Sequence, residues 1–179
     1  MDETSDNELV RLFKSGDANA FDAIVRRFQD RVFRLASVWL YDPQFAADAV
    51  QEVFLRAFKG LRRFRFGAAP FSWLYRTTRL VCHEFNRRRS AATLDTEPED
   101  PGPAPDRQVA DHATAGKVRE FVAGLPERQR DVVMLRIFED MSVADTAKVM
   151  GCRQGTVKAL LHKATRRLQL EMSKTGFEA

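Results

Sequence analysis

The chain has 179 residues, of which 44% are hydrophobic, and a formal net charge of +4; this length allows one or two domains. It contains no run of about eighteen apolar residues, which excludes a transmembrane helix, and residues 1–6 show neither the basic nor the apolar region of a signal peptide. Its two cysteines, Cys82 and Cys152, are too few for a disulfide scaffold, so we expect a protein of the reducing cytoplasm.

The first half of the chain predicts four helices. A short helix follows Asp6 and ends at Gly16 and Asp17, and Asp42-Pro43 is typical of an N-cap followed by proline at the first helical position. Apolar residues at three- and four-residue spacing define the second, third and fourth helices. These stripes are Phe21, Ile24, Val25, Phe28, Val32, Leu35 and Trp39; Phe45, Ala49, Val53 and Ala57; and Phe71, Leu74, Tyr75, Thr78, Val81, Cys82 and Phe85.

A change of composition separates two domains. Residues 96–106 contain four of the seven prolines and no large apolar residue, so this stretch cannot bury enough surface to offset its ordering entropy. We therefore predict a first domain over residues 1–89, an acidic, part-extended linker over residues 90–110, and a second domain over residues 111–179.

The second domain is also expected to be helical. A helix carrying Val118, Phe121 and Val122 should end near Gly124, and Pro126 should start another that continues through Ile137. Residues 142–145 resemble a capping box, Gly151 is typical of a helix end, and a last amphipathic helix follows. Its apolar face consists of Val157, Leu160, Leu161, Ala164 and Leu168. No segment shows sustained period-two alternation, so the predicted fold class is all-α.

Charge is concentrated in blocks. Residues 53–89 hold ten basic side chains and one acid, and residues 146–170 hold six basic side chains and no acid. Residues 91–112, which contain the linker, hold six acids and one arginine. Clustered positive charge of this kind is what a protein that binds a polyanion needs.

Residues 142–168 predict a helix-turn-helix, because a capped short helix, a tight turn and a longer basic helix follow one another. The second helix of such a motif enters the major groove with its N-terminal part facing base edges. Here that part contains Arg153 and Gln154, whose side chains suit guanine and adenine. Further candidate DNA contacts lie off the apolar stripe: Thr156, Lys158, His162, Lys163 and Arg166. The alternative is an ordinary helical hairpin with a solvated basic face.

A second candidate site interleaves aromatic side chains with arginines. Residues 62–67 read Arg-Arg-Phe-Arg-Phe-Gly in a loop, and aromatic rings beside positive charge suit unstacked bases. The following helix presents Trp73, Arg76, Thr77, Leu80 and His83 on the face opposite Leu74 and Tyr75. The alternative is that Phe64 and Phe66 pack under the loop.

Catalytic motifs are missing from the sequence. It has no glycine-rich phosphate-binding motif and no Gly-x-Ser-x-Gly. Cys82 and His83 are adjacent, but no second ligand pair has zinc-finger spacing. We therefore expect no catalytic residue, cofactor or metal, and an enzyme or metal sensor using Cys82, His83 and Cys152 is kept only as an alternative.

Two pairs of segments resemble a known family. Residues 48–58 and 71–76 are similar to region 2 of bacterial sigma factors, and residues 125–132 with 155–164 are similar to region 4. The length leaves no room for the first and third regions of larger sigma factors, a pattern that resembles the extracytoplasmic-function (ECF) subfamily.

The resemblance implies a dissociable initiation subunit of RNA polymerase. The third helix would dock on the clamp coiled coil of the largest catalytic subunit through Asp48, Gln51, Glu52, Leu55 and Arg56. The loop and the fourth helix would open and read the −10 promoter element through Phe64, Arg65, Phe66, Gly67, Trp73, Arg76, Thr77, Leu80, His83 and Arg87. Region 4 would bind the polymerase flap, and its last helix would read the −35 element through Arg153, Gln154, Thr156, Lys158, Ala159, His162, Lys163 and Arg166.

The resemblance also implies a regulatory partner. Members of the subfamily are usually held inactive by an anti-sigma factor, often membrane-anchored, and we expect one here. Four residues depart from the family's pattern: Ala49 and Leu80 replace a bulkier aliphatic and an asparagine, and Ala159 and Leu160 replace a more polar Ser-Arg pair. The alternative is a free-standing helix-turn-helix activator with a helical sensor domain, which would leave the region 2 motif and the loop of aromatics and arginines unexplained.

Overall fold

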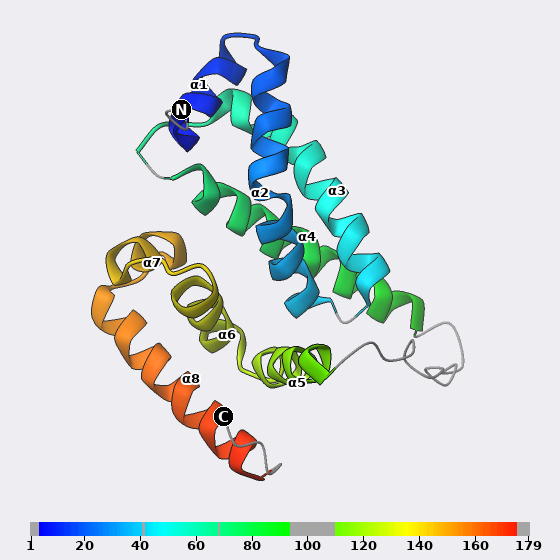
Figure 1. Cartoon of the computed structure of the whole chain (residues 1–179), viewed down its shortest axis with the longest axis vertical. Helices are drawn as coiled ribbons and strands as arrows, with labels where there is room; N and C mark the ends of the chain where they lie inside the picture. Colours follow the sequence, from blue (N-terminus) through cyan, green and yellow to red (C-terminus); the bar gives the residue numbers. More distant parts are fainter. Residues whose placement is uncertain (1–3, 41, 68, 94–109, 175–179) are drawn as a thin grey trace. The chain divides into compact units, whose positions relative to one another are not determined.

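The computed structural model describes residues 4–40, 42–67, 69–93 and 110–174. Regular secondary structure in those ranges is helical (Figure 1), which confirms the predicted all-α class. The chain divides into two compact units, Met1–Thr96 (unit 1) and Glu97–Ala179 (unit 2). Within the described ranges, none of the helices combines the length and the apolar composition that crossing a membrane requires.

The described residues of unit 1 form four α-helices and one short 3₁₀-helix. They are α1 (Asp6–Lys14), α2 (Ala18–Trp39), α3 (Pro43–Gly60), η1 (Leu61–Arg63) and α4 (Pro70–Thr93). Side chains of Ser5, Asp17 and Asp42 cap the first three helices by accepting backbone N–H bonds. The predicted Asp42-Pro43 start is therefore confirmed, whereas α4 continues four residues beyond the predicted domain boundary at residue 89.

The core of unit 1 lies where α2, α3 and α4 pack against one another. Phe28 of α2 is fully buried and stacks on Phe71 of α4, with their ring centroids 6.0 Å apart. The buried stripe of α3 is Ala46, Ala49, Val53 and Ala57. Phe45 does not belong to it, contrary to the prediction, because Ala46 completes the three-and-four spacing and turns Phe45 about 100° toward solvent.

Unit 2 is built around its last helix. Its elements are α5 (Ala110–Ala123), α6 (Glu127–Val133), the π-helix η2 (Met134–Phe138), α7 (Val143–Met150) and α8 (Gln154–Lys174). Helices α5, α6 and α7 all contact α8, and Val157 and Ala164 are the buried residues on α8.

The helix that begins after Pro126 does not continue regularly to Ile137 as predicted. From Met134 it widens into a π-helix: the Glu139 N–H donates to the Met134 carbonyl 3.0 Å away, and the Arg136 side chain donates to the Met141 carbonyl. Met134 and Leu135 remain buried, but Ile137 is exposed. Hydrophobic spacing does not reveal such a turn, because it depends on which carbonyl each N–H reaches.

The turn between α7 and α8 has the geometry of a helix-turn-helix. Gly151 ends α7 in the left-handed conformation, with φ of 60°, as predicted. At the start of α7, Ser142 Oγ accepts from the Asp145 N–H at 3.0 Å, and its hydroxyl donates to Asp145 Oδ2 at 2.7 Å. Asp145 thus binds the hydroxyl of Ser142 where the Glu of a capping box would reach a backbone N–H, because its side chain is one methylene shorter.

Candidate nucleic-acid interface

The loop that follows η1 contains two aromatic rings in different environments. Phe64 is only 6% exposed, whereas Phe66 is 42% exposed, and the two rings meet edge to face with centroids 5.6 Å apart. Arg65 and Gly67 are exposed beside them. Phe64 was expected to contact bases, but its ring packs under the loop, so Phe66 is the ring that this loop offers for stacking.

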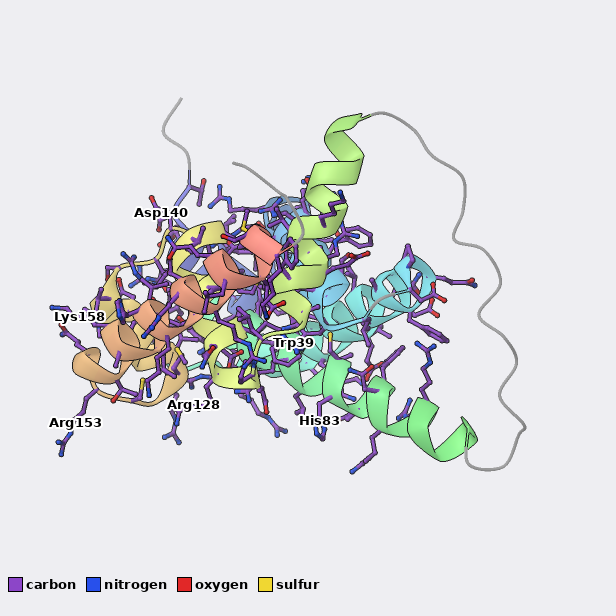
Figure 2. The ribbon with its side chains drawn as sticks, turned by 90° about the horizontal axis from the view of Figure 1, so that it is seen from below. Trp39, His83, Arg128, Asp140, Arg153 and Lys158 are labelled. Carbon is purple, nitrogen blue, oxygen red and sulfur yellow. The ribbon has the colours of Figure 1, made fainter. Side chains whose placement is uncertain are left out.

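The predicted faces of α4 are found in the structure. Leu74, Tyr75, Thr78, Val81 and Cys82 are buried. The opposite face carries the remaining candidates for the −10 element: Trp73, Arg76, Thr77, Leu80, His83 and Arg87, which are exposed or half-buried. In Figure 2, His83 points outward from α4. The fourth helix therefore holds one face in the core and presents the other as a mixed aromatic and basic surface.

Trp73 is positioned by a glycine on the preceding helix. The indole lies against Gly60 at the end of α3 so closely that a β-carbon at Gly60 would overlap its six-membered ring. Since the overlap involves the far end of a side chain, substitution at Gly60 would displace the indole with little effect on the backbone. Sequence reasoning did not identify Gly60, because the contact joins two helices.

One ion-pair network links α3 to α4. Arg56 donates to both carboxylate oxygens of Glu84, at 3.0 and 2.7 Å, and to Glu52 at 2.6 Å. These bonds raise the pKa of Arg56 above its ordinary value, and the hydrogen bonds from Arg56 lower the pKa of Glu84. The one acid in the basic block 53–89 is thus ionised and paired within unit 1.

The outward face of α3 carries most of the residues expected to dock on polymerase. Asp48, Gln51 and Leu55 are exposed, Leu55 to 62%, and Glu52 is half-buried at the same helical spacing. Arg56 was predicted to belong to this surface, but its guanidinium is directed to Glu84 of α4.

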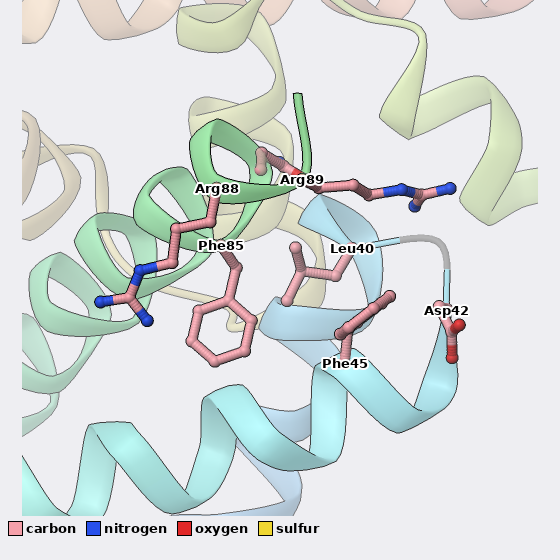
Figure 3. A pocket seen from close by; sticks show the side chains of 7 residues that line it. Leu40, Asp42, Phe45, Phe85, Arg88 and Arg89 are labelled. Carbon is pink, nitrogen blue, oxygen red and sulfur yellow. The ribbon is translucent and has the colours of Figure 1, made fainter. Parts of the chain in front are cut away.

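An apolar groove lies between the ends of α2 and α4 and the start of α3. Its volume is about 350 Å³, and its lining is Leu40, Asp42, Phe45, Phe85, Asn86, Arg88 and Arg89. Figure 3 shows the side chains of Leu40, Phe45 and Phe85 gathered together, with the two arginines extending to either side. Phe45 and Phe85 were assigned to core stripes from the sequence, although each ends its stripe beside a loop.

Unit 2 presents its candidate residues from the start of α8. Arg153 precedes the helix, and its carbonyl accepts from the N–H groups of Thr156 and Val157, at 2.9 and 3.2 Å. In Figure 2, the Arg153 and Lys158 side chains point away from the ribbon. All eight residues proposed for the −35 element are exposed: Arg153, Gln154, Thr156, Lys158, Ala159, His162, Lys163 and Arg166.

The cysteines and histidines do not converge. Cys82 is buried in unit 1, where desolvation raises the pKa of its thiol to about 12, whereas the adjacent His83 is exposed. Among the described residues, no three His, Cys, Asp or Glu side chains gather closely enough to hold a metal ion.

Comparison with known proteins identifies both units. Residues 24–92 match the Sigma-70 region 2 family, and residues 115–168 match the Sigma-70 region 4 family. The chain is 38% identical over 167 residues to the ECF RNA polymerase sigma factor SigM of Mycobacterium tuberculosis, covering 93% of this chain and 84% of the relative.

Two solved structures share the fold. CnrH, in complex with the cytosolic domain of CnrY, has a TM-score of 0.75 at 20% identity and covers 94% of this chain and 97% of that one. The sigma factor RpoE in complex with the anti-sigma factor NepR, from Bartonella quintana, has a TM-score of 0.67 at 22% identity, with coverage of 86% and 96%.

Proposed function

The chain belongs to the extracytoplasmic-function family of RNA polymerase sigma factors, and on that premise we propose how its residues divide the work of transcription initiation. The outward face of α3 docks on the clamp coiled coil of the largest polymerase subunit. The loop at residues 64–67 and the outward face of α4 melt and read the −10 element, and α8 reads the −35 element while unit 2 binds the flap. The chain itself performs no catalysis and acts with polymerase in the cytoplasm.

The observation that carries this proposal is the pairing of two different surfaces in one chain. Unit 1 offers exposed Phe66 and half-buried Trp73 among arginines, which suits unstacked single-stranded bases. Unit 2 offers one exposed basic helix after a helix-turn-helix turn, which suits the major groove of duplex DNA. A promoter-recognition subunit needs both, because it binds a duplex and then opens it.

The experiment that tests this function is run-off transcription with bacterial core polymerase on the upstream region of the protein's own gene, paired with a core-binding assay. We expect a discrete transcript that depends on the protein. If no transcript formed but the protein bound core polymerase tightly, the chosen upstream region would not contain its promoter. If no transcript formed and core polymerase was not bound, the proposal would be contradicted. In that second case, tight binding of the protein alone to a duplex operator would favour the free-standing activator.

The docking face can be tested separately from promoter recognition. Replacing Gln51 and Leu55 by alanine should weaken core binding without loss of folding, because both side chains point to solvent. Gln44→Ala, an exposed change on the same helix, serves as the control. Unchanged core affinity in the double variant would contradict the docking assignment.

The role of Trp73 in opening has its own test. Trp73→Ala should impair promoter opening more than closed-complex binding, since stacking contributes ~1–3 kcal/mol per base. A pre-melted promoter should restore transcription. Gly60→Ala should reproduce a weaker form of the same defect by displacing the indole. If the pre-melted template does not rescue Trp73→Ala, the stacking role is wrong.

We also propose that a membrane-anchored anti-sigma factor holds the protein inactive and that one of its acidic amphipathic helices occupies the groove of Figure 3. The groove combines apolar Leu40, Phe45 and Phe85 with the positive charge of Arg88 and Arg89, which complements such a helix. RpoE, which shares the fold, was solved in complex with the anti-sigma factor NepR.

The partner is tested by co-purification from the host under non-inducing conditions, using the wild type and Phe45→Glu. A protein that accompanies the wild type alone, and that blocks run-off transcription when added back, would support the proposal. If Phe45→Glu captured the partner as well as the wild type did, the groove would not be its binding site. If no inhibitory partner were found at all, the proposal of an anti-sigma factor would be contradicted.

A further inference from the structure

Helix α1 has no role in the function proposed above. The match to region 2 begins at residue 24, so Asp6–Lys14 lies outside it. Nevertheless α1 makes several contacts with the loop at residues 64–67, about fifty positions later in the chain. These contacts involve the two cationic side chains on one face of α1, Arg11 and Lys14, which are three residues apart.

Lys14 holds the loop through its backbone and through a ring. Its ammonium donates to the Phe64 carbonyl at 2.9 Å and lies 5.0 Å from the centroid of the Phe66 ring. The Arg11 guanidinium lies 5.2 Å from the same centroid. The exposed ring of the loop is therefore bounded by two cations from α1 and by the edge-to-face contact with buried Phe64.

Helix α1 is itself fixed to the rest of unit 1, so these cations have a defined position. Phe13, directly before Lys14, is buried and forms a three-ring cluster with Phe21 of α2 and Phe58 of α3, with centroid separations of 5.0 to 5.4 Å. At the other end, Arg27 of α2 pairs with Asp6 at 3.0 Å. A rigid support of this kind lowers the ordering cost of a loop that binds a ligand.

We propose that Arg11 and Lys14 are positioning residues for recognition of the −10 element: they hold Phe66 and the loop in the conformation that accepts an unstacked base. The inference rests on the proposed function, in which this loop reads that element. It assigns part of the promoter specificity to a helix that the region 2 match does not include. The base contacts themselves belong to the loop and α4, while α1 acts through Phe66 and the Phe64 carbonyl.

The test uses the full chain, alone and assembled with bacterial core polymerase. Promoters are first selected from a randomised duplex pool with the wild-type holoenzyme, and run-off is then compared between the selected template and templates with one base changed in the −10 element. The variants are Arg11→Met with Lys14→Met, Lys14→Arg as the conservative change, and Arg26→Met as a control that removes one exposed positive charge from α2. Amide exchange of residues 61–67 is measured in the free protein.

We expect the double variant to exchange faster in the loop and to lose about fivefold in the run-off ratio between the selected and the altered templates. Its core affinity should match the wild type and its unfolding midpoint should fall only slightly, because the apolar side of α1 is untouched while the contacts of the two cations are lost. Lys14→Arg should retain most of the wild-type ratio, and Arg26→Met should leave the ratio unchanged.

Two results would overturn the inference. One is an unchanged loop exchange or an unchanged ratio in the double variant. The other is an equal loss of ratio in Arg26→Met, which would assign the effect to general charge. A wild-type holoenzyme that selects no promoter would instead refute the proposed function, even where the exchange data show that α1 holds the loop.

Discussion

The two units fix their DNA-facing side chains by different means. In unit 1, aromatic rings supply much of the core (Phe13, Phe28, Phe54, Phe64, Phe71 and Tyr75 are buried), and arginines lie over Phe13, Phe28 and Phe71. In the described part of unit 2, the buried apolar residues are valine, leucine, alanine and methionine. Unit 1 thus joins its helices largely through aromatic rings, whereas in unit 2 a local cap and turn set where α7 and α8 begin, and non-aromatic contacts with α5, α6 and α7 bury one face of α8.

This difference fits the roles that we propose for the two surfaces. To bind an unstacked base, an aromatic ring and a positive charge from different helices have to lie in a fixed arrangement. Helices α1, α3 and α4 therefore have to be held together. A helix that enters the major groove carries its candidate contacts on one element, and needs only a correct start and a buried face. From this contrast we expect substitutions at contacts between helices to have the largest effects in unit 1. In unit 2 we expect effects from substitutions within a single helix, its cap or its turn.

The largest expected effect breaks the aromatic core of unit 1 alone. Phe28→Ala removes a fully buried ring stacked on Phe71 and should lower the free energy of unfolding of that unit by ~3–5 kcal/mol. Hydrogen exchange should accelerate in α2, α3 and α4, with α6, α7 and α8 unchanged. Equal acceleration in both units would show that they unfold as one body and would break the comparison.

The next effect concerns specificity in unit 2. Arg153→Ala should cost ~1–3 kcal/mol of discrimination at one base pair if its guanidinium reads guanine at the start of α8. Run-off on a set of −35 variants measures this, with Lys158→Ala as the comparison. A loss that is the same on every sequence would make Arg153 a phosphate contact.

A smaller effect tests the link between α3 and α4. Glu84→Gln should cost about 1.5 kcal/mol near neutral pH, a value between those of exposed and buried charged hydrogen bonds. Because the pKa of Glu84 is lowered in the folded protein, the pair stabilises above the unfolded carboxyl pKa of about 4.3 and is lost as the pH falls further. Denaturation at several pH values should therefore bring the variant and the wild type together in acid.

The control for this pair is Asp30→Asn, which neutralises an exposed carboxyl on α2. It should shift stability by less than Glu84→Gln at neutral pH. If both variants behaved alike, the Arg56 contact would be no stronger than a solvated surface charge, and the contrast between the units would weaken.

The smallest effect sharpens the local character of unit 2. Ser142→Ala removes the cap of α7 and should cost about 1 kcal/mol, while Ser142→Asn should retain most of the stability. Thermal unfolding of unit 2, followed by exchange in α7 and α8, measures the change. A loss as large as that of Phe28→Ala would mean that the turn, and not the buried face of α8, holds the motif together.

The features predicted correctly are those that the local sequence determines. The starts at Asp42 and Ser142, the turn at Gly151 and the two faces of α4 depend on residues within one or two helical turns. The α3 stripe shows how sensitive such a prediction is to a shift of one residue. The sequence assigned Phe45 to the buried stripe, but the buried residue is its neighbour Ala46.

The features that were missed depend on partners elsewhere. Phe64 and Phe66 have the same side chain and share Arg65 as a neighbour, so only the packing under the loop distinguishes the buried ring from the exposed one. Arg56 looked like a surface residue because its partner, Glu84, is 28 positions away on another helix. The contacts between α1 and the loop could not be predicted for the same reason, because they join residues about fifty positions apart.

The burial of Cys82 should make chemical labelling of the native protein selective for its other cysteine, Cys152. Burial raises the pKa of this thiol to about 12, so it stays protonated near neutral pH, and the side chain is also shielded from reagents. Cys152 is half-exposed in the turn before α8. A maleimide dye should therefore attach at a single place, beside the helix proposed to enter the major groove, and report promoter engagement without any engineered residue.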